Sequence, residues 1–180
     1  MGDDRRHGLR LLLEGRPGVG KTTVARRVAD LLREAGIPLK GFITEEVRES
    51  GRRVGFAIGT FDGNRAMLAH VDFHGPPRVS RYGVDIGAFE GVALQALAGI
   101  GEGEVVVLDE LGKMELASDS FCNAVSDIFG LAVPIVATAQ IAFHPFTDGL
   151  KRRPDVETVW VNERNRGELP KEVAARLIGR

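Results

Sequence analysis

Two patterns of apolar residues alternate along the chain, short continuous runs and longer stretches at helical spacing. The run Leu11–Leu13 is continuous, whereas the apolar positions of residues 21–35 recur every three or four residues. Gly36 and Pro38 follow that stretch and are typical of a helix end. The pattern predicts a buried strand over residues 10–14 and then a helix.

After this helix the pattern changes to segments in which apolar and polar residues alternate. Three such segments are expected to be strands, Gly41–Val47, Val54–Phe61 and Ala66–Val71. The pair Asp62-Gly63 between the last two is a strong signal for a tight turn. Because short turns join antiparallel neighbours, the sequence predicts an antiparallel meander inserted after the first helix, followed by a loop at residues 74–78.

Strand and helix patterns alternate again over the rest of the chain. Val105–Leu108 is a continuous apolar run, as expected of a parallel strand buried on both faces. The expected elements are a helix near Asp85–Ala98, that strand, a helix that Ser118 or Asp119 caps, a strand at Val133–Ala137, a short helix from Pro145, a strand at Val156–Val161 and a helix at Glu168–Ile178. This alternation predicts one α/β domain over residues 1–180, with a mainly parallel sheet between helices.

Composition and charge limit the kinds of molecule that the protein is expected to bind. Of the 180 residues 43% are hydrophobic, and the formal net charge is −1. A near-neutral charge without a basic stripe argues against nucleic acid as a ligand. No segment reaches the roughly 18 apolar residues of a membrane helix, and residues 1–7 contain no apolar signal core. The only cysteine, Cys122, cannot form an internal disulfide, which fits a reducing compartment. We therefore expect a cytoplasmic protein, and the lack of a membrane segment leads us to expect no membrane association.

The turn between the first strand and the first helix carries the strongest chemical signal. It runs from Gly15 into Lys21 and Thr22 in the Walker A pattern G-x-x-x-x-G-K-S/T. Its glycines let backbone N–H groups approach phosphate oxygens, while Lys21 suits the β- and γ-phosphates and the Thr22 hydroxyl suits Mg²⁺. The sequence thus predicts a P-loop that binds a nucleoside triphosphate through Gly15, Arg16, Pro17, Gly18, Val19, Gly20, Lys21, Thr22 and Thr23.

An acidic Walker B motif follows the apolar strand at Val105–Leu108. A carboxylate at the end of such a strand is expected beside the P-loop threonine, so we predict that Asp109 and Thr22 hold Mg²⁺. Glu110, one residue further, is predicted to orient the attacking water as a general base. Residues 109–112 also match the D-x-x-G switch of guanine-nucleotide proteins, but the chain has no N-K-x-D motif to read guanine.

Together these motifs resemble those of the THEP1 family of nucleoside-triphosphatases. The resemblance spans nearly the whole chain and includes Gly41–Glu49, Arg53–Phe56, Tyr82–Asp85 and Asp109–Leu116. It implies a three-layer, RecA-like P-loop NTPase fold with an antiparallel strand insertion after the first helix. It also implies slow, Mg²⁺-dependent hydrolysis of ATP, GTP and other nucleoside triphosphates to the diphosphate and phosphate.

The resemblance also brings Lys113 and Glu115 into the site region. A lysine here is suited to the negative charge that develops on the γ-phosphate, so Lys113 is a predicted catalytic residue beside Lys21 and Glu110. Glu115 is expected either to orient Lys113 or to cap the next helix.

Several residues near the C-terminus have alternative interpretations. Where the family tends to have Glu-Asn-Arg-Asp, residues 164–167 are Arg-Asn-Arg-Gly, and base binding by Asn165 and Arg166 is a hypothesis. Trp160 is able to stack on a nucleobase, but its place within a predicted strand favours the core. The basic run at residues 151–153 is interpreted as a solvated helix end.

Three functions are consistent with these motifs. We favour a nucleoside-triphosphatase in which Glu110 orients water. A small-molecule kinase would use the same phosphate-binding loop, but the chain shows no inserted arginine-rich lid of the kind that excludes water from such kinases. An NTP-gated binding protein with slow turnover would share every motif. The sequence decides neither the base preference nor the oligomeric state.

Overall fold

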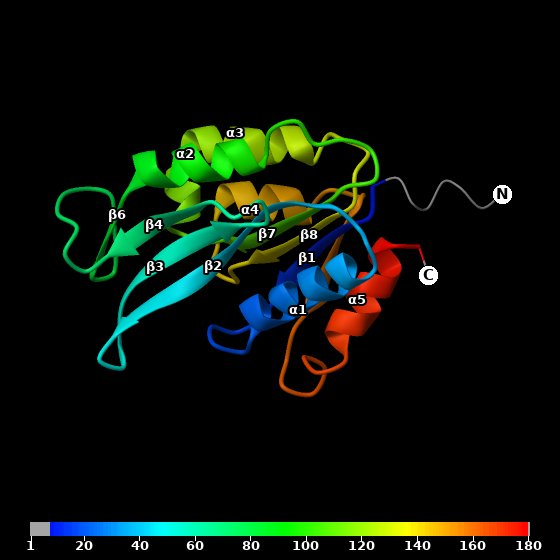
Figure 1. Ribbon diagram of the computed structural model, residues 1–180, viewed down its shortest axis with the longest axis horizontal. Helices are drawn as coiled ribbons and strands as arrows, with labels where there is room; N and C mark the ends of the chain where they lie inside the picture. The colour runs from blue at the N-terminus through cyan, green and yellow to red at the C-terminus, as the bar shows by residue number, and fades with distance from the viewer. Residues whose placement is uncertain (1–7, 180) are drawn as a thin grey trace.

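The computed structural model describes residues 8–179 and shows one mixed sheet between two layers of helices (Figure 1). Within these residues the sheet has nine strands in the order β5-β6-β4-β3-β2-β7-β8-β1-β9. The strands are β1 (Arg10–Glu14), β2 (Leu39–Glu49), β3 (Arg52–Thr60), β4 (Arg65–His70), β5 (Arg78–Val79), β6 (Tyr82–Val84), β7 (Val105–Leu111), β8 (Ile135–Ala139) and β9 (Val156–Trp160). The helices are α1 (Lys21–Glu34), α2 (Ile86–Ala96), α3 (Asp119–Ile128), α4 (Pro145–Lys151) and α5 (Leu169–Leu177), with a 3₁₀ turn η1 (Glu115–Ala117).

None of the helices in residues 8–179 is long and apolar enough to cross a membrane. The prediction that the chain lacks an N-terminal signal core concerns residues 1–7, which lie outside the described residues.

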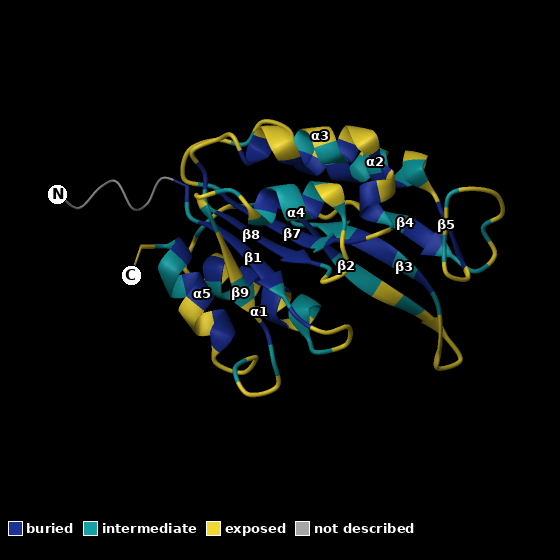
Figure 2. Cartoon of the chain, turned by 180° about the vertical axis from the view of Figure 1, so that it is seen from behind, coloured by how far each residue is buried: buried dark blue, intermediate teal, exposed yellow. Residues whose placement is uncertain are grey.

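Five strands form the parallel part of the sheet, and they include the continuous apolar runs of the sequence. β1 pairs in parallel with β8 and β9, and β7 pairs in parallel with β2 and β8. Nearly every side chain of β1, β7 and β8 is buried because helices cover both faces of these strands. Figure 2 shows them as the buried centre of the molecule. The predicted α/β class is confirmed.

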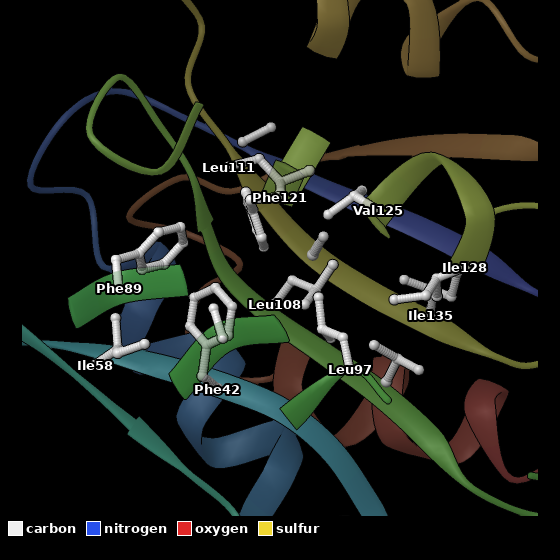
Figure 3. Packing of buried hydrophobic residues seen from close by; sticks show 14 of the residues in the cluster. Phe42, Ile58, Phe89, Leu97, Leu108, Leu111, Phe121, Val125, Ile128 and Ile135 are labelled. Atoms are coloured by element: carbon white, nitrogen blue, oxygen red, sulfur yellow. The ribbon is translucent and has the colours of Figure 1, made fainter. Parts of the chain in front are cut away.

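Helices α2, α3 and α4 cover one face of the sheet, and α1 and α5 cover the other (Figure 1). On the first face the rings of Phe89 and Phe121 pack edge to face, with centroids 5.0 Å apart (Figure 3). Leu12 of β1 belongs to this cluster, whereas its neighbours Leu11 and Leu13 pack against α1 and α5. Successive side chains of a strand point to opposite faces, so β1 contributes to both cores of the three-layer fold.

Four strands extend the sheet in antiparallel fashion beyond β2. The predicted meander is present as β2, β3 and β4, but β2 is not confined to it. Residues 42–49 of β2 pair antiparallel with β3 along one edge, and residues 39–43 pair parallel with β7 along the other, so β2 joins the two halves of the sheet. The sequence pattern also misses β5 and β6, because strands of two and three residues are too short to show alternation.

Two predictions about strand residues are wrong. The sequence places Asp109 at the end of this strand and Glu110 after it, but β7 continues to Leu111 and contains both. It also places Trp160 in the core, whereas Trp160 is the last residue of β9 and 47% of its surface is exposed. β9 lies at the edge of the sheet, so a position within this strand does not imply burial.

Candidate nucleotide-binding site

A cavity of about 870 Å³ opens where the carboxyl ends of β7, β8 and β1 lie side by side. Ligands of open α/β sheets bind at this end of the strands. The turn after β1 brings the P-loop to the cavity, and β7 brings the acidic motif. The residues that line it are Gly15, Pro17, Gly18, Gly20, Lys21, Thr22, Thr23, Arg26, Thr44, Glu45, Glu46, Arg53, Phe56, Glu110, Lys113, Gln140, Ile141 and Ala142.

The P-loop has the backbone geometry that its glycines predict. Gly18 and Gly20 have φ of 77° and 107°, in the left-handed region that favours glycine. Gly20 is the N-cap of α1 and, within the described part of the chain, no side chain caps this helix, so its first N–H groups are available to an anion. The Lys21 ammonium, only 10% exposed, donates to the Gly15 carbonyl at 3.2 Å and lies 3.8 Å from a Glu110 carboxylate oxygen.

Asp109 is fully buried directly behind the P-loop threonine. Its Oδ1 accepts hydrogen bonds from Thr22 Oγ1 at 3.1 Å and from Thr138 Oγ1 at 2.7 Å, and its Oδ2 accepts one from Thr44 N at 3.3 Å. Burial raises the pKa of Asp109 to about 6, opposed by the hydrogen bonds from the threonines and reinforced by the charge of Glu110. The predicted neighbours Asp109 and Thr22 are therefore in direct contact, although 87 residues separate them.

Glu110 and Lys113 point a carboxylate and an ammonium group toward the same space. Both line the cavity together with Lys21, and the Glu110 side chain is 32% exposed. The three predicted catalytic residues thus lie together on one cavity. A carboxylate that water reaches, on the same cavity as two cationic side chains, is able to accept a proton from water while the cations attract phosphate oxygens.

Glu115 lies behind this surface and does not line the cavity. It is 4% exposed, and burial raises its pKa to about 8, with smaller contributions from the charges of Glu110 and Asp109. Its carboxyl group therefore carries a proton at neutral pH. A Cβ atom added at Gly112 would lie 3.0 Å from Glu115 Oε2 and 3.6 Å from Glu110 Cδ, so both glutamates approach this glycine. Glu115 starts η1 but does not cap α3, because Ser118 accepts the hydrogen bond from Phe121 N.

A second cavity of about 610 Å³ adjoins the outer side of the P-loop. Its lining consists of the P-loop residues Arg16, Pro17, Gly18 and Val19, of Trp160 at the end of β9, and of residues 161–164 that follow it. Arg16 and Val19, predicted as phosphate contacts, therefore lie on this cavity and not on the larger one. Pro17 and Gly18 line both.

Asn165 and Arg166, the residues of the base-binding hypothesis, are not among the residues that line the two cavities. The Asn165 side chain donates to the Trp160 carbonyl at 2.8 Å and accepts from the Asn162 N–H at 2.9 Å. The Arg166 guanidinium donates to the Val19 carbonyl at 3.1 Å. These contacts hold the segment after β9 in shape and join it to the P-loop.

Three residues of the site region make contacts that none of the sequence motifs predicts. Thr44 and Thr138 contact Asp109 from β2 and β8, the two strands that flank β7, so only the order of the sheet brings them together. Lys151 is not a solvated helix end: its side chain is 18% exposed and pairs with Glu14, the last residue before the P-loop. The sequence signal for this ion pair is the charge of Glu14 at the end of an apolar strand, because a charge in that place needs a partner of opposite sign.

Comparisons with known proteins agree with this geometry. Residues 10–174 match the protein family described as NTPase. Nucleoside-triphosphatase THEP1 of Thermotoga petrophila is 41% identical, with 92% of this chain and 90% of that protein aligned. The human cancer-related nucleoside-triphosphatase is 37% identical over 88% of this chain and 91% of its own length.

Two solved structures share the fold. The solution structure of a human cancer-related nucleoside triphosphatase matches with a TM-score of 0.81 and 37% identity, covering 92% of this chain and 95% of that one. The crystal structure of THEP1 from the hyperthermophile Aquifex aeolicus matches with a TM-score of 0.80 and 32% identity, covering 91% of this chain and 96% of that one.

Proposed function

Since this chain belongs to the NTPase family, with the THEP1 proteins among its relatives, we propose that it is a Mg²⁺-dependent enzyme that hydrolyses ATP, GTP and other nucleoside triphosphates to the diphosphate and phosphate. One observation carries the proposal beyond the names of relatives. The P-loop and the acidic motif, distant in sequence, meet on one cavity with Thr22 bonded to Asp109 and Lys21 near Glu110.

The P-loop binds the triphosphate in this proposal. Backbone N–H groups of the loop and of the first turn of α1 donate to phosphate oxygens, and Lys21 neutralises the β- and γ-phosphates. Lys21 is held by the Gly15 carbonyl and is flanked by Glu110, so its ammonium group is already positioned at the floor of the cavity. Lys113 adds a second positive charge on the same cavity.

The side chains of Thr22 and Asp109 fit a magnesium site. Both offer hard oxygen atoms, and Mg²⁺ in phosphate sites takes one or two protein ligands while phosphate and water complete its shell. The fit rests on Asp109, because a fully buried carboxylate that has no cationic partner among residues 8–179 is suited to a metal cation. When bound, Mg²⁺ supplies positive charge to the phosphate oxygens.

Glu110 performs the proton transfer in this proposal. Its carboxylate accepts a hydrogen bond from a water molecule in line with the γ-phosphate. As the water oxygen bonds to the γ-phosphorus, its proton passes to Glu110, and the bond from the γ-phosphorus to the bridging oxygen breaks, which releases the diphosphate. Lys21 and Lys113 stabilise the charge that develops on the phosphate oxygens.

We expect the ligands to be free nucleotides, in the cytoplasm. The near-neutral net charge disfavours nucleic acid, and the single cysteine is consistent with a reducing compartment.

The test is phosphate release from ATP, GTP, CTP and UTP, with Mg²⁺ or with a chelator, in the wild type and in Glu110→Gln. We expect release that needs Mg²⁺ and falls about 100-fold or more in Glu110→Gln, while nucleotide affinity is retained. Glu102→Gln, an exposed glutamate in the loop before β7, is the matched control and should leave release unchanged.

The same assay is repeated with nucleosides and nucleoside monophosphates as acceptors. If release is negligible until an acceptor is added and a phosphorylated acceptor then appears, the protein is a kinase and the hydrolase proposal is wrong.

A further inference from the structure

Trp160 is a large aromatic side chain that the fold leaves uncovered at the entrance of a cavity. It ends β9 with 47% of its surface exposed and forms part of the wall of the 610 Å³ cavity on the outer side of the P-loop. Tryptophan is highly buried on average in proteins, and an indole that lines a cavity offers a flat apolar face to a planar ligand.

This cavity is continuous in its lining with the proposed phosphate site. Pro17 and Gly18 form part of both walls, so the two cavities lie on either side of the same P-loop turn. A ligand whose phosphates occupy the larger cavity therefore has a short path around Pro17-Gly18 into the smaller one. In a nucleotide the groups that extend away from the phosphates are the sugar and the base.

The segment that carries Trp160 is held against the P-loop by hydrogen bonds within the protein. Asn162 Oδ1 accepts from the N–H groups of Arg164 at 2.9 Å and of Asn165 at 3.1 Å, and Asn165 in turn donates to the Trp160 carbonyl. The bond from Arg166 to the Val19 carbonyl joins this turn to the phosphate-binding loop. A preformed wall of this kind reduces the ordering cost of binding.

We propose that Trp160 is the stacking platform for the nucleobase of the substrate, an inference that rests on the proposed nucleoside-triphosphatase function. Every base has a π-face, so stacking accepts all four bases and favours the larger purines. The polar residues of its lining are Asn162 and three exposed charged residues of both signs, Arg16, Glu163 and Arg164. The site therefore binds the base mainly by stacking, and this explains acceptance of several nucleoside triphosphates at one site.

Because Trp160 is the only tryptophan of the chain, its fluorescence reports on the cavity directly. The wild type is titrated with non-hydrolysable analogues of ATP, GTP, CTP and UTP, and separately with inorganic tripolyphosphate, which has no base. We expect the four analogues to quench the emission and tripolyphosphate to bind, as followed by calorimetry, without quenching.

Variants separate stacking from phosphate binding. Trp160→Ala should weaken the analogues roughly 5- to 150-fold and reduce the preference for purines, with the affinity for tripolyphosphate within about twofold of the wild type. Trp160→Phe should restore most of the loss. Leu131→Ala, at another exposed apolar residue outside both cavities, should change none of these values.

Two results would overturn the inference: unchanged nucleotide affinity in Trp160→Ala, or an equal loss for tripolyphosphate. Failure of the proposed function gives a different result, since the wild type would then release no phosphate or bind neither nucleotides nor tripolyphosphate. Binding is measured with analogues that are not hydrolysed, so the inference is tested independently of turnover.

Discussion

Replacing Glu115 by glutamine tests the unusual protonation of this buried carboxyl group. The pKa of Glu115 is about 8 in the folded protein, against 4.5 for a glutamate in water, because burial disfavours the charged form. Between these two pH values the unfolded chain releases the proton and the folded protein keeps it. The free energy of unfolding therefore falls as pH rises through this window, and the loss is complete near pH 8.

The size of this loss follows from the difference between the two pKa values. At about 1.4 kcal/mol for each pH unit, the interval from 4.5 to about 8 corresponds to about 5 kcal/mol, an order-of-magnitude value. Glutamine has nearly the shape of a protonated glutamate and does not titrate. Glu115→Gln should therefore gain several kcal/mol of stability relative to the wild type between pH 5 and pH 8, whatever its stability at pH 5.

The assay is urea unfolding of both proteins at pH 5, 6, 7 and 8, in the presence of a chelator. The exposed residue Glu102 provides the control, because Glu102→Gln should follow the wild type at every pH. Parallel stability curves for the wild type and Glu115→Gln would refute the reasoning, since they would mean that Glu115 titrates alike in the folded and unfolded chains.

Two further substitutions test polar contacts that only the folded structure revealed. Thr138→Val keeps the buried shape but removes the 2.7 Å hydrogen bond to Asp109, so we expect the free energy of unfolding at pH 8 to fall by about 1.5–3 kcal/mol. A loss below about 0.5 kcal/mol in urea unfolding would contradict that contact. Lys151→Met leaves the Glu14 carboxylate, 12% exposed, without its cation and should cost about 2 kcal/mol in the same assay. Lys171→Met, which breaks an exposed ion pair, should cost less than about 1 kcal/mol. Equal losses for the two lysines would show that the pair of Lys151 with Glu14 stabilises the fold no more than an exposed pair does.

The P-loop half of the candidate site was predictable because its determinants are local. Gly18 and Gly20 have the positive φ that their turn needs, and the apolar residues on either side form a strand and a helix through short-range patterns. The contact between Thr22 and Asp109 was also predictable, because parallel strands bring their carboxyl ends to one edge of the sheet.

The rest of the site depends on which strands become neighbours. Thr44 and Thr138 surround Asp109 only because β2 and β8 flank β7 in the sheet order. Lys151 belongs to the site only because α4 packs where it pairs with Glu14. Neither the hydrophobic periodicity nor the motifs of the sequence predict these contacts.

By itself the sequence determined the class of fold, the P-loop and the two acidic residues beside it, because apolar periodicity and backbone requirements act over a few residues. Tertiary structure alone decided that β2 serves two sheet halves, that Trp160 is exposed at the edge and that Glu115 is buried beside Glu110. Burial and charge depend on neighbours distant in the chain. The protonation of Glu115 and the exposure of Trp160, on which the sharpest experiments rest, are therefore properties of the folded molecule.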